Sequence, residues 1–188
     1  MKRRGSRSRD MQQTIAAPAS EAPSAADAAF EALYRSSRDD VYGYVASLLR
    51  DRSAAEDVTA LSFERAYRKR NRFDSRRGNQ RAWLFGIARN AALDELRARK
   101  RKAALLSEPE DLATVPMDDA AETSLRRATL RTALAQLSAR ERELIGLKFF
   151  AGLSNAEIAT VIGVSESNAG TKLHRAITKL RKACDETV

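Results

Sequence analysis

The chain has 188 residues, a net charge of +9 and a sequence pI near 10.1, and 26 of its 34 basic residues are arginine. This length holds one ordinary domain or two small helical ones, and the positive charge favours a polyanionic partner such as nucleic acid. The single cysteine, Cys184, excludes an internal disulfide, and one histidine, His174, is too few for a metal cluster, so we expect no metal and no cofactor.

Nothing in the sequence predicts membrane insertion or export. No run of about 18 apolar residues is present. The basic start MKRRGSRSRD is followed by polar, Ala and Pro residues where a signal peptide would have an apolar core. We therefore expect a cytoplasmic protein with no membrane span.

Residues 1–26 are predicted to be a disordered basic extension. They are rich in Ala, Ser and Pro and show no apolar periodicity that could bury a core face. Two interpretations fit this composition, a basic arm that touches DNA and a simple unstructured extension, and Met11 is a second candidate start.

Residues 27–102 are predicted to form a first domain of three packed helices. The first helix begins near Ala29 and runs for about twenty residues, because its apolar residues share one helical face. Ser53 with Glu56 predicts a capping box that opens the second helix, and the third helix starts near residue 81. The apolar residues expected in this core are Phe30, Leu33, Tyr34, Val41, Val45, Leu48, Leu49, Val58, Leu61, Phe63, Ala66, Trp83, Leu84, Ile87, Ala88 and Ala91.

The loop NRFDSRRGNQ before the third helix lies in a strongly basic segment. Eight basic residues occur between Arg65 and Arg81, and the third helix ends in the run RARKRK. Cations beside Phe73 and Trp83 suit single-stranded nucleic acid, because an unstacked base can pack against an aromatic wall. For Trp83 a core position is at least as good an interpretation, so the loop is the better candidate for base contact.

Residues 103–124 are predicted to be a flexible acidic linker. They contain six acids, two prolines and no basic residue. Such a stretch is typical of a solvated tether. Its negative charge also suits a basic channel, as the negative charge of nucleic acid does.

Residues 125–188 are predicted to form a second helical domain, which opens with Leu130, Leu134 and Leu137 on one face. Ser138 with Glu141 predicts another capping box, the second in chain order after that of Ser53 and Glu56. The segment 154–183 then has the pattern of a helix, a sharp turn and a second helix.

The turn of that segment is specified by a few residues. Ser154 with Glu157 forms a further capping box, Gly163 falls where the chain needs positive φ, and Ser165 can cap the second helix. A basic second helix is the docking element of helix-turn-helix proteins, which enters the major groove. An ordinary helical hairpin with a solvated basic face is the alternative. The fold class expected from the whole sequence is all-α, with two small helical domains, a flexible acidic linker, and a helix-turn-helix in the second domain.

Four stretches, in this order, resemble the extracytoplasmic-function group of the sigma-70 family of bacterial transcription initiation factors. They are FEALYRSSRDDVYGYV, AEDVTALSFERAYR, AWLFGIARNAALDELRARKR and LSARERELIGLKFFAGLSNAEIATVIGVSESNAGTKLHRAITKLRK. The resemblance covers residues 29–183. It implies a non-enzymatic subunit that binds core RNA polymerase, through the clamp of the largest subunit and the flap of the second largest.

The resemblance also implies promoter DNA as a partner, double-stranded at the minus-thirty-five element and melted at the minus-ten element. Residues 27–102 would serve the minus-ten element and 125–188 the minus-thirty-five element, and an anti-sigma factor is a further partner that some members have.

The resemblance assigns three sets of site residues. Those expected in the major groove at minus-thirty-five are Ser167, Asn168, Thr171, Lys172, Arg175 and Lys179. Those expected at minus-ten are Phe73, Arg76, Arg77, Gly78, Asn79, Gln80, Asn90, Asp94, Arg97 and Lys100. Those expected on core polymerase are Asp57 and Phe63.

Three positions depart from the family pattern. Ala60 and Leu61 replace a usual Gln and acidic residue of the polymerase-binding helix. Gly170 replaces a common Lys on the recognition helix, where glycine costs about 0.5 to 1 kcal/mol relative to alanine. Close backbone approach to DNA and a tolerated defect are the two interpretations of Gly170.

Two other functions are compatible with parts of this sequence. A free-standing helix-turn-helix regulator would bind duplex DNA as a dimer, although the N-terminal half lacks the alternating strands of a response regulator. A metal-dependent nuclease would need its carboxylates to converge, and Asp57, Asp74 and Asp94 have no spacing that demands this.

Overall fold

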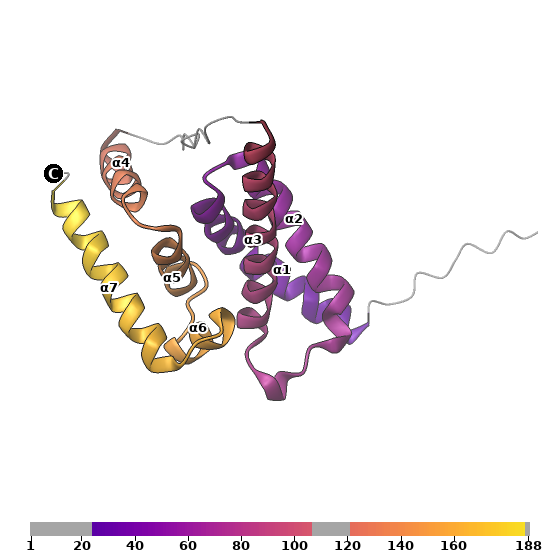
Figure 1. Cartoon of the computed structure of the whole chain (residues 1–188). Coiled ribbons are helices and arrows are strands. Elements are labelled where there is room, and N and C mark those ends of the chain that lie inside the picture. The colour runs from indigo at the N-terminus through magenta and orange to yellow at the C-terminus, as the bar shows by residue number, and fades with distance from the viewer. Residues whose placement is uncertain (1–23, 107–120, 187–188) are drawn as a thin grey trace, which may run out of the picture.

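The computed structural model describes residues 24–106 and 121–186, and every regular element in these two ranges is a helix. The first range forms an N-terminal lobe and the second a C-terminal lobe (Figure 1). The N-terminal lobe contains α1 (Ala25–Leu49), α2 (Arg52–Lys69), the short 3₁₀ helices η1 (Arg70–Arg72) and η2 (Ser75–Arg77), and α3 (Gln80–Leu106). The C-terminal lobe contains α4 (Ala121–Ala135), α5 (Ala139–Phe149), α6 (Asn155–Ile162) and α7 (Glu166–Asp185).

Two helix starts in the N-terminal lobe differ from the sequence prediction. Ser24 caps α1 by accepting the N–H of Asp27 at 3.2 Å, so residues 24–26 belong to the lobe and not to the predicted extension. The remainder of that extension, 1–23, lies outside the described residues.

The predicted capping box of Ser53 and Glu56 was wrong. Asp51 is the N-cap of α2, because its extended backbone aims the carboxylate at the N–H of Ala54, 3.0 Å away. The same carboxylate receives Arg99 of α3 at 2.9 Å, so the cap also ties two helices together. Glu56 is bonded instead to Arg52, one turn before it.

Helices extend into both ends of the predicted linker. α3 continues through Leu106 and α4 begins at Ala121, because the segments AALL at the end of α3 and AE at the start of α4 consist of good helix formers. The part of the linker between them, 107–120, lies outside the described residues.

The capping signals of the C-terminal lobe are confirmed. Ser138 opens α5 and Ser154 opens α6, and each forms a reciprocal box with the glutamate three residues later. Gly163 ends α6 with φ of 72°, a left-handed conformation that favours glycine, and Ser165 caps α7. The helix-turn-helix of the sequence prediction is therefore present.

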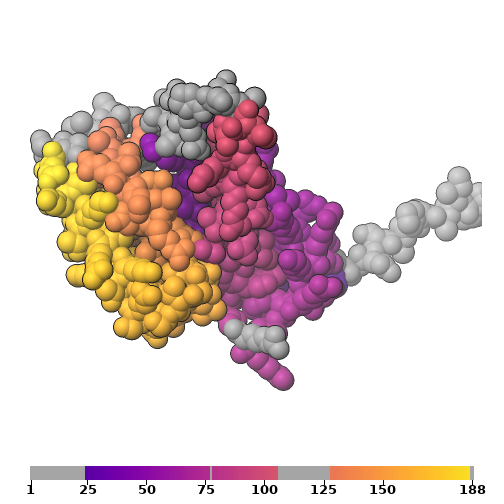
Figure 2. All heavy atoms as spheres, in the orientation of Figure 1, coloured from indigo at the N-terminus to yellow at the C-terminus, as the bar shows by residue number. Residues whose placement is uncertain are grey.

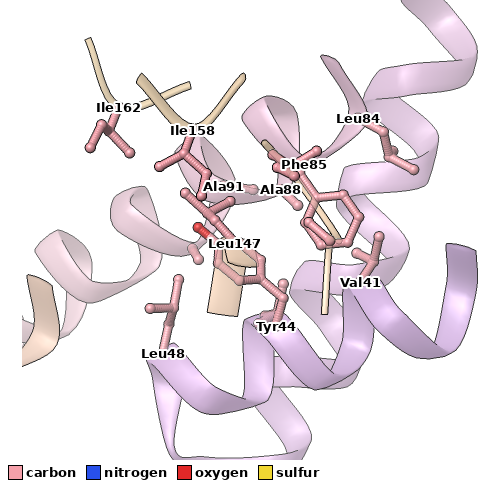
Figure 3. Packing of buried hydrophobic residues seen from close by; sticks show 14 of the residues in the cluster. Val41, Tyr44, Leu48, Leu84, Phe85, Ala88, Ala91, Leu147, Ile158 and Ile162 are labelled. Carbon is pink, nitrogen blue, oxygen red and sulfur yellow. The ribbon is translucent and has the colours of Figure 1, made fainter. Parts of the chain in front are cut away.

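One continuous core runs through both lobes. Buried residues of α1, α2 and α3 form one cluster with buried residues of α5, α6 and α7. A second, smaller cluster contains Leu137, Ile145 and Ala176. Figure 3 shows Tyr44 and Leu48 of α1 and Phe85 of α3 directed toward Leu147 of α5 and Ile158 of α6. In Figure 2 the C-terminal lobe, coloured orange to yellow, lies directly against the N-terminal lobe. The two predicted helical units are thus in close contact, which the sequence did not indicate.

Candidate nucleic-acid interface

The second helix of the helix-turn-helix, α7, separates an apolar face from a polar one. Ala169, Leu173 and Ala176 are buried against the rest of the C-terminal lobe. The predicted major-groove residues lie on the other face: Ser167, Asn168, Thr171, Arg175 and Lys179 are exposed and Lys172 is half-buried. The hydroxyls, amide and cations of this set can donate to base edges and phosphates from one surface.

Lys179 forms an ion pair within the C-terminal lobe. Its ammonium lies 3.0 Å from the carboxylate of Glu141, in the capping box of α5. The pKa of Glu141 is lowered, first by the backbone hydrogen bond from Ser138 and also by Lys179. Lys179 thus joins α7 to α5.

Gly170 lies on the side of α7 that faces α6. A Cβ at this position would stand 3.3 Å from the side-chain amide nitrogen of Asn155. A methyl group here would need only a small shift of the Asn155 side chain, which is exposed, so this contact does not by itself require glycine.

The loop between α2 and α3 presents a mixture of aromatic and basic groups. The rings of Phe73 and Trp83 are 5.3 Å apart and tilted by 49°, and both side chains are half-buried. Arg76 and Gly78 are exposed, while Gln80 is half-buried at the start of α3. The side chain of Arg77 lies outside what the structure describes.

Asn79 is bonded at both ends of its amide. Its oxygen accepts the N–H of Arg81 at 2.8 Å, which caps α3. Its nitrogen donates to the carboxylate of Glu157 in α6 at 3.0 Å. The pKa of Glu157 is lowered by the backbone hydrogen bond from Ser154 first, and by Asn79 as well. The predicted base-reading residue therefore contacts the C-terminal lobe in this structure.

The remaining minus-ten candidates lie along one side of α3. Asn90, Asp94, Arg97 and Lys100 are all exposed, at spacings of three and four residues that place them on a common face. Asp94 lies 3.4 Å from Arg97 and 3.6 Å from Arg65 of α2. The carboxylate of Asp94 thus pairs with two arginine side chains, Arg97 and Arg65, at the same surface.

The two polymerase candidates on α2 differ in exposure. Asp57 is exposed, whereas Phe63 is only 6% exposed and packs edge-on against Tyr34 with centroids 4.8 Å apart. The Phe63 ring can therefore support the shape of α2 but has little surface to offer a partner. Beside it, a pocket of about 400 Å³ lies between α1 and α2. Its lining includes Tyr34, Arg38, Tyr42, Glu56, Ala60 and Phe63.

Several residues at the contact between the lobes were missed by sequence reasoning. Arg81 was counted only as one cation of a basic segment, and Glu143 was not singled out. Glu143 is 3% exposed and receives both Arg89 of α3 and Arg140 of its own helix. A buried charge between helices far apart in the chain has no local sequence signal, because its partners are set by packing.

The described residues contain neither a cluster of metal-binding side chains nor a membrane-spanning helix. In 24–106 and 121–186, no group of three or more His, Cys, Asp or Glu residues could hold a metal ion. Within the same ranges, no helix is both long and apolar enough to cross a bilayer.

Comparison with known proteins identifies the class to which this fold and this surface belong. A family model for sigma-70 region 2 matches residues 33–102, and a model for sigma-70 region 4 matches residues 127–180. These are the two conserved parts of RNA polymerase sigma factors, which initiate transcription and are in general not enzymes.

Relatives that match over most of this chain identify the group of sigma factors to which it belongs. The chain is 34% identical over 164 residues to the ECF RNA polymerase sigma factor SigL of Mycobacterium tuberculosis, covering 86% of this chain and 93% of the relative. It is 36% identical over 161 residues to the RNA polymerase sigma factor CarQ of Myxococcus xanthus, with 84% and 90% coverage. The chain therefore belongs to the extracytoplasmic-function sigma factors of the sigma-70 family.

A solved structure shares the arrangement of both lobes. The sigma factor RpoE from Bartonella quintana, crystallised with the anti-sigma factor NepR, has a TM-score of 0.75 and 25% sequence identity to this chain. The match covers 84% of this chain and 97% of that one.

Proposed function

We propose that α7 reads the minus-thirty-five element of promoters in duplex form. The observation that supports this most is the division of α7 into a buried apolar face and an exposed face of hydroxyl, amide and cationic groups. A helix held in this way by a capped turn can lie in the major groove with its backbone fixed by α6. The basic residues supply phosphate contacts, and the polar ones supply base contacts.

We assign the minus-ten element to the loop 73–80 and the exposed side of α3. The tilted rings of Phe73 and Trp83 can stack with an unpaired base, while Arg76 and Arg97 attract the backbone of the melted strand. Extruding a base from the duplex costs a few kcal/mol, which such stacking and charge contacts offset.

Core RNA polymerase is the partner that carries out synthesis, and we assign its docking surface to α2. The exposed Asp57 and the neighbouring pocket, with its aromatic walls and mixed charges, resemble the anchor pockets of protein interfaces. The flap of the second largest subunit is the corresponding partner of the C-terminal lobe. This role places the chain in the cytoplasm with the polymerase and assigns it no catalytic residue.

An anti-sigma factor is proposed as a regulatory partner. This proposal is supported by the similarity of both lobes to RpoE, a sigma factor whose structure was solved with NepR bound.

Reconstitution with core polymerase tests the proposed function. The chain should co-purify with core polymerase and give salt-sensitive open complexes on a promoter, whereas the chain alone should bind that promoter poorly. Failure to co-purify together with absence of initiation would refute the role.

The same preparation separates the two alternatives. Tight binding of a palindromic duplex by a dimer without polymerase would favour a free-standing regulator. Cleavage of a labelled duplex in the presence of magnesium would favour a nuclease.

A further inference from the structure

The first turns of α1 pack beside the end of α2, just before the loop that leads to α3 (Figure 1). The carboxylate of Asp27 lies 2.9 Å from Nε of Arg70, and neither side chain is more than 31% exposed. One turn further along α1, the ring of Phe30 meets that of Tyr67 edge-on, with centroids 5.2 Å apart. Two residues near the start of α1 thus contact two residues at the end of α2.

Arg70 is one of the eight basic residues between Arg65 and Arg81, yet its guanidinium already has partners. Besides pairing with Asp27, it lies over the ring of Tyr67, 3.8 Å from the centroid. Its Nη1 also donates to the carbonyl of Tyr67 at 2.9 Å. A guanidinium held on a ring face and paired with a carboxylate has fewer donors left for a phosphate. Arg70 therefore supports the loop from within the protein.

The acid of this pair is held in place within α1 itself. Ser24, the N-cap, donates its hydroxyl to the carboxylate of Asp27 at 2.7 Å. The pKa of Asp27 is lowered, first by the hydrogen bond from Ser24 and also by Arg70 and Tyr67, so this carboxylate is charged at neutral pH. A negative charge in the first turn also suits the helix dipole. The same carboxylate thus stabilises the start of α1 and binds Arg70.

The backbone runs directly from Arg70 to the aromatic residue of the proposed minus-ten loop. The carbonyl of Arg70 accepts the N–H of Phe73 at 3.3 Å, and this hydrogen bond closes η1. Phe73 then lies against Trp83 of α3, with ring centroids 5.3 Å apart. Because a 3₁₀ turn fixes the path of its residues, the position of Arg70 determines where the Phe73 ring lies relative to Trp83.

The contact joins a segment outside the family match to one inside it. Asp27 and Phe30 lie before residue 33, where the match to the sigma-70 region 2 model begins, whereas Tyr67 and Arg70 lie within the match. The contact therefore depends on the first turns of α1, which the family model does not include.

We propose that Asp27 and Phe30 are positioning residues for the minus-ten loop. By holding Arg70 and Tyr67 they fix the path of η1, and with it the placement of the Phe73 ring against which an unpaired base would stack. This functional consequence rests on the proposed minus-ten role of the loop 73–80. The positioning itself can be measured in the chain without DNA.

Trp83 is the only tryptophan of the chain, so its fluorescence reports directly on the loop. In the full-length chain, Asp27→Asn removes the charge that Arg70 faces and keeps the size of the side chain. The acrylamide quenching constant of Trp83 should rise about twofold, because a displaced Phe73 no longer covers the half-buried indole. Far-UV circular dichroism verifies that the helix content is unchanged.

Glu31→Gln is the matched control. Glu31 lies one turn beyond Asp27 on α1 and also pairs with an arginine, but this partner, Arg35, belongs to the same helix. The substitution again replaces a carboxylate by an amide and breaks an ion pair. Trp83 quenching and open-complex formation should both stay at the level of the unaltered chain.

Arg70→Met tests the pair from the other side, since methionine keeps an apolar stem on the ring of Tyr67. Both substitutions break the same contact, so the double variant should be quenched no more than either single variant. Additive effects would overturn the claim that Asp27 and Arg70 act as a pair. Should Arg70→Met fail to fold, Phe30→Leu removes the neighbouring ring contact and should change Trp83 quenching in the same direction.

Open-complex formation with core polymerase tests the functional consequence. Asp27→Asn and Arg70→Met should each slow it about fivefold, the factor expected for one partly exposed ion pair. The slope of log affinity against log salt should stay that of the unaltered chain in both variants. A slope reduced by about one in Arg70→Met alone would show that Arg70 contacts phosphate, and would overturn its assignment to the support of the loop.

The two proposals fail in different ways. Trp83 quenching that neither Asp27→Asn nor Arg70→Met changes would refute the positioning role. Altered quenching with normal open-complex formation would refute its functional consequence. Altered quenching in a chain whose unaltered form gives no open complexes with core polymerase would instead refute the proposed function.

Discussion

Arg175 is the simplest residue at which to test phosphate contact. It is exposed on the polar face of α7, one turn beyond Thr171. Arg175→Ala should weaken promoter binding of the polymerase complex on all sequences alike, and should reduce the slope of log affinity against log salt by about one. Filter binding or fluorescence anisotropy at several salt concentrations measures both effects.

Lys182→Ala provides the control for this prediction. Lys182 lies on the last turn of the same helix, 3.7 Å from Glu186, and its loss changes the charge equally. The salt slope should then stay close to that of the unaltered chain. A change of sequence preference in Arg175→Ala without a change of slope would contradict the phosphate role.

Asn79 combines two tasks that substitution can separate. Asn79→Ala removes the cap of α3 and should lower the free energy of unfolding by about 1 kcal/mol. Asn79→Ser keeps an acceptor for the N–H of Arg81 and should cost only a few tenths of a kcal/mol. Urea denaturation measures this difference.

Both Asn79 variants lose the amide that we assign to base recognition. Each should therefore change promoter preference within the minus-ten element, whatever its stability. Transcription from a library of randomised minus-ten sequences measures the preference, and an unaltered profile in both variants would remove Asn79 from the recognition surface.

At the scale of single elements, the capping boxes of α5 and α6 make stability depend on pH. The pKa values of Glu141 and Glu157 are lowered below 4.5, mainly by backbone hydrogen bonds from Ser138 and Ser154. Their contribution to stability is present above pH 4.5 and is lost as the pH falls through the folded-state pKa values. The chain should therefore lose stability in acid through these two helix starts.

Glutamine tests this origin, because it keeps an acceptor for each capping box but does not titrate in this range. The double variant Glu141→Gln with Glu157→Gln should show a flatter fall of Tm between pH 6 and pH 3 than the unaltered chain. The two proteins should converge at the acid end. An identical pH profile would show that other carboxylates dominate.

At the scale of the whole molecule, a buried ion pair links the lobes. Arg89 of α3 is bonded to Glu143 of α5, and their side chains are 15% and 4% exposed. Arg89→Met should lower the free energy of unfolding by about 2 to 3 kcal/mol, because Glu143 keeps only Arg140 as a partner in a buried site. Urea denaturation followed by circular dichroism measures this loss.

The double variant Arg89→Met with Glu143→Leu completes the cycle. It should recover most of the stability, since two apolar side chains replace the pair without leaving a charge buried. A double variant no more stable than Arg89→Met would show that packing, and not the charge left behind, causes the loss.

The sequence by itself determined the local parts of this protein. Capping boxes at Ser138 and Ser154, the glycine turn at Gly163 and the apolar stripe of α7 depend on residues within a few positions of one another. Such signals are readable because helix ends need local partners for their free N–H groups. Asp51 and Ser53 were competing local candidates for the N-cap of α2. Asp51 is the cap, and it also accepts a hydrogen bond from Arg99 of α3.

Only the tertiary structure decided how the two helical units meet. Gly43, Tyr44 and Gly146 have no pattern that marks a helix crossing, and Arg81 gave no sign of four partners outside its own helix. These contacts join residues 41 (Arg81 and Asp40) to 107 (Gly43 and Phe150) positions apart, and their geometry follows from how whole helices pack. The candidate site residues were assigned from sequence alone and stay a prediction, while the hydrogen bond between Asn79 and Glu157 was set by that long-range packing.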